Sequence, residues 1–190
     1  MKAAKPLPPP NPLRLDVLAL ADRGEWLQGQ APVGSFARLA DPGEPAPAAD
    51  AALQWKARAE RRPVRGGAPE LWLHLQADVV VPRTCQRCLQ PVDLPLAVQR
   101  DFLFAPTEEQ AQAWDAERDE ADVLVLSKSL NILELVEDEL ILELPLVPRH
   151  DACPQPLVAT NSAPDGDEMS PKVKERDNPF AVLAQLKRSQ

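Results

Sequence analysis

Three runs in the middle of the chain alternate between apolar and polar side chains, and this period of two constrains the fold more than any other feature. The runs cover residues 53–61, 71–81 and 94–104. Side chains of a strand point alternately to the two faces of a sheet, so each run predicts a strand with one buried face. Short connections between successive runs favour an antiparallel meander. The predicted class is therefore α+β, an antiparallel sheet with a few helices packed on one face.

The segment 131–144, "NILELVEDELILEL", has the spacing of a helix. Asn131 is a suitable N-cap, with Glu134 three residues later as in a capping box, and Pro145 is a stop signal. The apolar stripe consists of Leu133, Val136, Leu140 and Leu144. Four acidic residues are predicted to stay in solvent: Glu134, Glu137, Asp138 and Glu143.

Weaker patterns predict the remaining elements. Residues 14–23 have helical spacing and end at Gly24, and residues 34–41 suit a helical turn or two. Two further strands are expected at 25–33 and 123–127, and the acidic stretch 107–122 reads as an exposed helix or a loose insertion.

The prolines mark where packed structure is not expected. There are 22 of them, crowded into residues 6–12, 42–47 and 145–171. Four parts are predicted in consequence: a disordered N-terminus at 1–12, one α+β domain at 13–153, a disordered linker at 154–177 and an amphipathic motif at 178–190. In that last motif Phe180, Leu183 and Leu186 are candidates for binding a partner or the chain's own domain.

The three cysteines form the most specific chemical feature. Cys85 and Cys88 are separated by two residues in the connection between the second and third runs. A thioredoxin-like redox pair needs a helix after the thiols, whereas here prolines and a strand pattern follow. The pair fits a zinc knuckle better, and His150 with Cys153 would complete a set of four ligands. Because 61 residues lie between the two pairs, the alternative is a turn with two half-buried thiols and a surface His150.

Charge is divided unevenly along the chain, whose net charge is −8. Residues 51–100 hold eight Lys and Arg against four acids, while residues 101–170 hold seventeen acids against three bases. A basic block attracts polyanions, although an acidic half repels them. The candidate RNA contacts are Arg58, Arg61, Arg62, Arg65, Arg83 and Arg87.

No catalytic motif is evident: the sequence lacks GxSxG, HExxH and a glycine-rich phosphate loop. It also lacks an apolar run long enough to cross a membrane and the apolar stretch of a signal peptide, which predicts a soluble cytoplasmic protein. The absence of tyrosine argues against an aromatic platform for single-stranded nucleic acid.

Four pieces in order, "CQRCLQPV", "FAP", "VEDELILELPLVPRHDAC" and "NPFAVLAQLK", resemble the bacterial YceD family of large ribosomal RNA subunit accumulation proteins. The resemblance covers about residues 84–190. It implies a ribosome biogenesis factor that supports synthesis, processing or stability of 23S ribosomal RNA, without catalysis or a small-molecule substrate. It supplies no molecular mechanism.

Two ways of reaching the RNA follow from the residues. The six arginines could hold ribosomal RNA directly, or the acidic helix at 131–144 and the motif at 178–190 could bind a basic ribosomal protein or assembly factor. The charge balance slightly favours this second, adaptor hypothesis. The alternative to both is a zinc-knuckle structural protein or a thiol-dependent redox protein unrelated to ribosomes.

Overall fold

In the computed structural model a five-stranded sheet forms the centre of the part of the chain that the structure describes, residues 10–118 and 120–154. Its strands follow the order of the chain. The first four are antiparallel, and the last is parallel to its neighbour. The strands are β1 (Leu27–Pro32), β2 (Ala52–Arg62), β3 (Glu70–Thr84), β4 (Pro91–Ala105) and β5 (Asp122–Val125).

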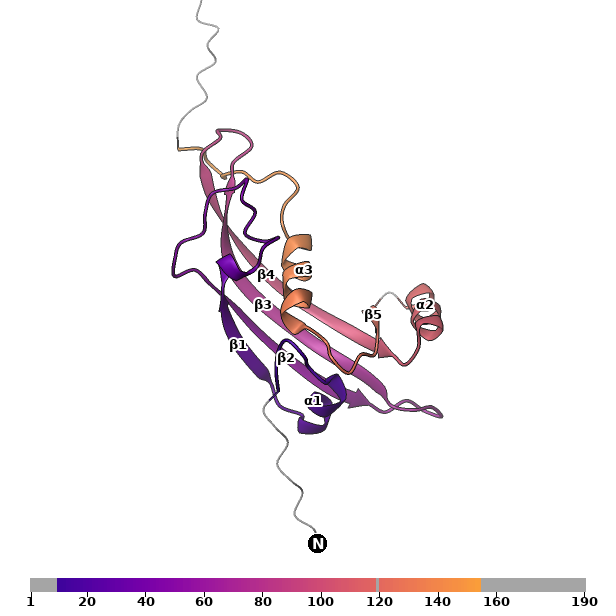
Figure 1. Cartoon of the computed structure of the whole chain (residues 1–190). Coiled ribbons are helices and arrows are strands. Elements are labelled where there is room, and N and C mark those ends of the chain that lie inside the picture. The colour runs from indigo at the N-terminus through magenta and orange to yellow at the C-terminus, as the bar shows by residue number, and fades with distance from the viewer. Residues whose placement is uncertain (1–9, 119, 155–190) are drawn as a thin grey trace, which may run out of the picture. The chain divides into compact units, whose positions relative to one another are not determined.

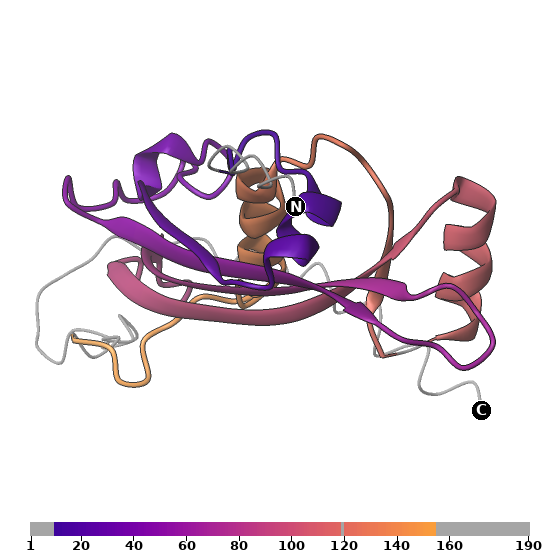
Figure 2. The same ribbon diagram turned by 90° about the horizontal axis from the view of Figure 1, so that it is seen from below.

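Two of the helices, α1 (Val17–Arg23) and α3 (Ile132–Leu142), cover one face of this sheet, which confirms the predicted α+β class (Figure 2). The others are the short 3-10 helix η1 (Val33–Ser35) and α2 (Glu108–Glu117). Figure 2 shows α1 and α3 on the same side of the strands, whereas α2 stands at one end of the sheet. The path of each element along the sheet can be followed in Figure 1.

The alternating runs build the core as their spacing predicts. On β2 and β3 the apolar positions Leu53, Ala57, Leu73 and Leu75 are fully buried, and they meet Val136 and Leu140 of α3 in one cluster. Trp55 lies in the same layer, against Gly29 of β1. A Cβ atom at Gly29 would lie 2.7 Å from the Trp55 ring, so this site accepts only glycine without movement of the ring.

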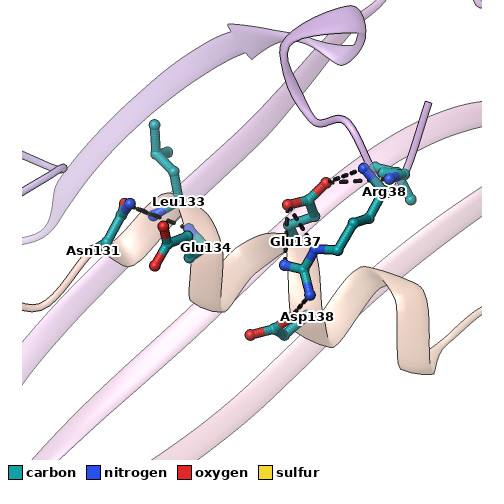
Figure 3. Close-up of polar contacts among 7 residues, drawn as sticks. Arg38, Asn131, Leu133, Glu134, Glu137 and Asp138 are labelled. Carbon is teal, nitrogen blue, oxygen red and sulfur yellow. Dashed lines mark hydrogen bonds and ion pairs between the residues drawn. The ribbon is translucent and has the colours of Figure 1, made fainter. Parts of the chain in front are cut away.

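α3 begins as its sequence predicts. The side-chain oxygen of Asn131 accepts hydrogen bonds from the backbone N–H groups of Leu133 and Glu134, at 3.2 and 3.5 Å (Figure 3). These bonds satisfy donors that the first turn of a helix leaves without partners.

One prediction about α3 is wrong. Glu137 was expected in solvent, but only 8% of it is exposed, because the segment after η1 passes over this side of the helix. Its carboxylate accepts bonds from the backbone N–H groups of Arg38 and Leu39, and it also pairs with the Arg38 guanidinium at 3.0 Å (Figure 3). Glu139, two residues further along α3, is buried as well and pairs with Arg100 of β4 at 3.2 Å.

The predicted linker at 154–177 and motif at 178–190, apart from residue 154, lie outside the described residues, as do residues 1–9 of the predicted N-terminal segment. Within the described part, no helix has the length and apolar character needed to cross a membrane.

Candidate metal centre

The connection between β3 and β4 positions the first two cysteines. The backbone N–H of Cys85 donates to the carbonyl of Gln90 at 2.9 Å, and the N–H of Leu89 donates to the carbonyl of Cys85 at 2.8 Å. Leu89 adopts a left-handed conformation with φ of 59°, which turns the chain back into β4. Cys85 is buried and Cys88 is partly buried, so both thiols lie on the inner side of a tight turn.

The segment after α3 brings the second pair to the same turn. The backbone N–H of Gln86 donates to the carbonyl of Pro148 at 2.8 Å and so holds the two segments together. In Figure 1 this segment, coloured orange, runs beside the hairpin connection. The side chains of Cys85, Cys88, His150 and Cys153, called the Cys3His cluster below, all place a ligand atom within 4.8 Å of one another.

The distances within the Cys3His cluster suit a tetrahedral metal site. The Sγ atoms of Cys85 and Cys153 are 3.9 Å apart, and Cys88 Sγ lies 3.5 Å from His150 Nδ1. Zinc bonds of about 2.3 Å to sulfur and about 2.0 Å to nitrogen give tetrahedral edges of about 3.5–3.8 Å. The four side chains could therefore hold a metal ion with little movement.

His150 is oriented for this role by a bond outside the cluster. Its Nε2 atom lies 2.9 Å from the carbonyl oxygen of Pro91, which can only accept. The hydrogen-bond pattern thus assigns the ring proton to Nε2 and leaves the Nδ1 lone pair directed at the cluster. A hydrogen bond from the ring nitrogen that does not bind the metal is the usual way in which proteins orient a histidine ligand.

Arg87, between the two cysteines of the turn, supports the other half of the cluster. Its Nε donates to Cys153 Sγ at 2.9 Å, and its Nη2 donates to the carbonyl oxygens of His150 and Asp151 at 3.0 and 3.3 Å. The guanidinium thus places positive charge beside the Cys153 sulfur and fixes the backbone that carries two ligands. The sequence predicts Arg87 only as an RNA contact, because its contacts with residues 150–153 depend on tertiary packing.

The turn also favours an ionised thiol at Cys85. Burial raises the pKa of Cys85, but the backbone N–H groups of Cys88, His150 and Arg87 outweigh it and lower the pKa to about 5. For Cys88 the backbone N–H of Gln90 lowers the pKa, whereas burial and the neighbouring thiols raise it, and the net shift is upward. Because metals bind the thiolate, a thiol that ionises below neutral pH is prepared for a metal.

The six arginines proposed as RNA contacts do not form one patch. Arg83 is only 6% exposed and donates to the carbonyl oxygens of Leu39 and Pro82, so its guanidinium does not lie on the surface as the hypothesis requires. Arg61 pairs with Asp22 of α1 at 2.9 Å. Arg65 is exposed in the turn between β2 and β3.

Arg58 and Arg62 lie together on the sheet face opposite the core. Arg62 donates to Glu60 at 2.6 Å and stacks on Trp72, with 4.2 Å from its Cζ to the ring centroid. Arg58 is 3.9 Å from the same Glu60. On this face His74 has both ring nitrogens engaged, one with Asp101 at 2.6 Å and the other near Glu60 at 3.3 Å. The partner-binding candidates Phe180, Leu183 and Leu186 lie outside the described residues.

Comparisons with known proteins agree with the resemblance in the sequence. Residues 73–187, more than half of the chain, match the family described as "Large ribosomal RNA subunit accumulation protein YceD". A protein of that name from Haemophilus influenzae is 32% identical over 108 residues, which cover 54% of this chain and 58% of the relative. No solved structure matches significantly. The chain therefore belongs to the YceD family of large ribosomal RNA subunit accumulation proteins.

Proposed function

We propose that this protein supports the accumulation of 23S ribosomal RNA as a non-catalytic factor in the cytoplasm, and that its Cys3His cluster binds one structural zinc ion. The family match and the name of the H. influenzae relative support the first part. The convergence of three thiols and one imidazole, from two segments far apart in the sequence, carries the second.

The ligand set favours zinc in a structural rather than a catalytic role. Thiolate and imidazole ligands in tetrahedral arrangement select zinc among the common ions of proteins. Four protein ligands fill a tetrahedral shell, whereas catalytic zinc sites keep one position for water or substrate. When bound, the ion would tie the segment after α3 to the hairpin between β3 and β4.

The arrangement of charges favours the adaptor hypothesis over direct binding of RNA. Of the six candidate arginines, Arg83 is buried and Arg87 is engaged at the Cys3His cluster. Arg61 and Arg62 pair with carboxylates, which reduces the positive potential available to phosphates. We therefore infer that the protein acts on ribosomal RNA through a basic protein partner.

Depletion of the protein in its own host tests the proposed function. The ratio of 23S to 16S ribosomal RNA should fall on depletion and recover when the wild-type chain is supplied. A chain carrying Cys85→Ser should restore the ratio less well, because the ligand shell is then incomplete. An unchanged ratio on depletion would overturn the proposed role in large-subunit RNA accumulation.

A further inference from the structure

We propose that β4 offers a free strand edge at residues 97–101, called the free β4 edge below, which binds an extended basic peptide by strand addition. This inference rests on the adaptor function proposed above and gives it a specific surface. None of the four residues of the Cys3His cluster belongs to this edge.

β4 has a full partner on one side only. β3 pairs with it from Pro91 to Phe104, whereas β5 pairs with it only from Phe102 to Ala105. Among the described residues, no strand pairs with the outer side of β4 before Phe102. An unpaired strand edge presents a row of backbone donors and acceptors to any extended chain.

The hydrogen-bond pattern identifies which residues of β4 face outward. In an antiparallel pair, residues that exchange hydrogen bonds alternate with residues that do not. The backbone N–H of Cys85 donates to the carbonyl of Gln90, so these two residues form a hydrogen-bonded pair. Every second residue of β4 after Gln90 is bonded to β3 in the same way, and Val98 and Arg100 are among them. The backbone groups of Ala97, Gln99 and Asp101 therefore point away from β3. The outward carbonyl of Ala105, which accepts from Leu126 after β5, follows the same alternation.

Pro95 limits the free edge at its other end. It is the next outward-facing residue before Ala97, and it has no N–H to donate. Proline on an edge strand is one of the ways in which proteins prevent uncontrolled strand pairing. The free outward groups are thus the N–H and carbonyl of Ala97 and Gln99 and the N–H of Asp101. The pairing of Phe102 with Asp122 directs the N–H of Asp122 at the Asp101 carbonyl, so the free edge continues directly into the position occupied by β5.

Acidic side chains lie beside the free β4 edge. A depression of about 770 Å³ lies beside Gln99 and Asp101, between β4, α2, the start of β5 and α3. We call it the acidic depression, because five carboxylates line it against two guanidinium groups. The carboxylates belong to Asp101, Asp115, Glu120, Asp122 and Glu139.

The two guanidinium groups of the depression are already paired with carboxylates. Arg100 pairs with Glu139 at 3.2 Å, and Arg118 pairs with Glu70 at 2.7 Å. Among the described residues, no cation forms an ion pair with Asp115, Glu120 or Asp122. A peptide bound along the free β4 edge would therefore lie beside carboxylates that no cation of the described residues neutralises, which favours a basic peptide.

The apolar side chain of Leu142 also lines the depression, and it is 73% exposed. Side chains of an added strand alternate between the two faces of the sheet, so apolar residues of the peptide can cover Leu142 while basic residues reach the carboxylates. The ligand class is accordingly an extended peptide that alternates basic and aliphatic residues.

A labelled octapeptide of alternating lysine and valine tests the proposal with the full-length protein. Fluorescence anisotropy should give saturable binding, and the same peptide with glutamate in place of lysine should bind at least tenfold more weakly. Amide hydrogen exchange should slow at Ala97, Gln99 and Asp101 when the lysine peptide is present. Equal binding of both peptides, or protection confined to other amides, would overturn the proposal.

Two proline variants separate the edge from general effects on the fold. Gln99→Pro removes an outward donor inside the free edge, and Asp93→Pro removes an outward donor on the same strand beyond Pro95. Losing one backbone bond should weaken binding of the lysine peptide about fivefold to tenfold in Gln99→Pro and leave it unchanged in Asp93→Pro. Equal losses in two variants with equal thermal stability would contradict the assignment.

The charge of the depression is tested in the same way. Asp115→Lys should weaken binding of the lysine peptide, whereas Glu117→Lys, on the same helix but outside the depression, should change it little. Equal effects of the two variants would remove the acidic depression from the site. A dimer in analytical ultracentrifugation that protects the same amides would assign the edge to a second copy and overturn the proposal.

The cellular readout distinguishes failure of this inference from failure of the proposed function. If depletion lowers the ratio of 23S to 16S ribosomal RNA and Gln99→Pro restores it fully, the function stands and the free edge is not its binding surface. If depletion leaves the ratio unchanged, the proposed function itself fails.

Discussion

The backbone N–H of Leu39 donates a hydrogen bond to the carboxylate of Glu137 at 3.1 Å, across 98 positions of the sequence. The N–H of Arg38 donates to the same oxygen at 2.9 Å (Figure 3). One side chain of α3 thereby satisfies two backbone donors of the segment after η1. This carboxylate joins the N-terminal part of the fold to the helix that covers the sheet.

Replacing Glu137 with alanine should lower the free energy of unfolding by about 1–3 kcal/mol, because it leaves buried donors without an acceptor. Urea denaturation followed by circular dichroism measures this change. Glu134→Ala, at an exposed site on the same helix, is the matched control and should have a much smaller effect. A loss no larger than that of the control would show that the contact does not stabilise the fold.

The stability that Glu137 contributes should depend on pH. Burial raises the pKa of Glu137, but the bonds from Leu39 and Arg38 outweigh it and lower the pKa below the ordinary value of 4.5. A lowered folded-state pKa gives stability that is present above the unfolded value and is lost as pH falls through the folded pKa. The stability difference between wild type and Glu137→Gln should therefore hold from pH 7 to about 4.5 and decrease below it. A stability difference that grows as the pH falls would contradict the lowered pKa of Glu137.

Arg87→Ala should weaken metal binding about 10-fold to 100-fold, the usual effect of losing a partner of the ligands. The reason is that its guanidinium donates to Cys153 and to the carbonyl of His150. Competition with a chromogenic zinc chelator measures the affinity. Arg65→Ala, which removes an exposed arginine far along the sheet, should leave the affinity unchanged; equal affinities of the two variants would exclude a supporting role for Arg87.

The adaptor account predicts little direct affinity for ribosomal RNA. A gel shift with 23S fragments at low salt should give no complex. If a complex forms, its affinity should fall steeply with salt, since each phosphate contact adds about 0.7–0.9 to the slope of log K against log salt. A complex that weakens in this way, and that Arg58→Ala and Arg62→Ala diminish, would favour direct binding instead.

The strands and α3 could be predicted from sequence because each has a single buried side that fixes its period. The runs at 53–61, 71–81 and 94–104 lie within β2, β3 and β4. The strand expected at 123–127 corresponds to β5, but its parallel pairing with β4 depends on the path of the chain through α2, which local periodicity does not describe.

The polar interior was harder to predict. Helical spacing placed Glu137 on the wet side of α3, yet the segment carrying Arg38 and Leu39 covers that side. The four ligand residues are recognisable by type, but whether two pairs with 61 residues between them meet depends on tertiary packing. Arg83 continues the alternation of Val79 and Val81 and so falls on the core face of β3. Its burial also depends on the segment carrying Leu39, which local alternation does not describe.

X-ray absorption at the zinc edge tests the central claim most directly. Protein purified without chelators should contain about one zinc ion per chain, with three sulfur neighbours at about 2.3 Å and one nitrogen at about 2.0 Å. Cys153→Ser should lose one sulfur from this shell or lose the metal. A wild-type protein without zinc, or zinc with fewer than three sulfur neighbours, would contradict the assignment of Cys85, Cys88, His150 and Cys153 as one structural metal centre.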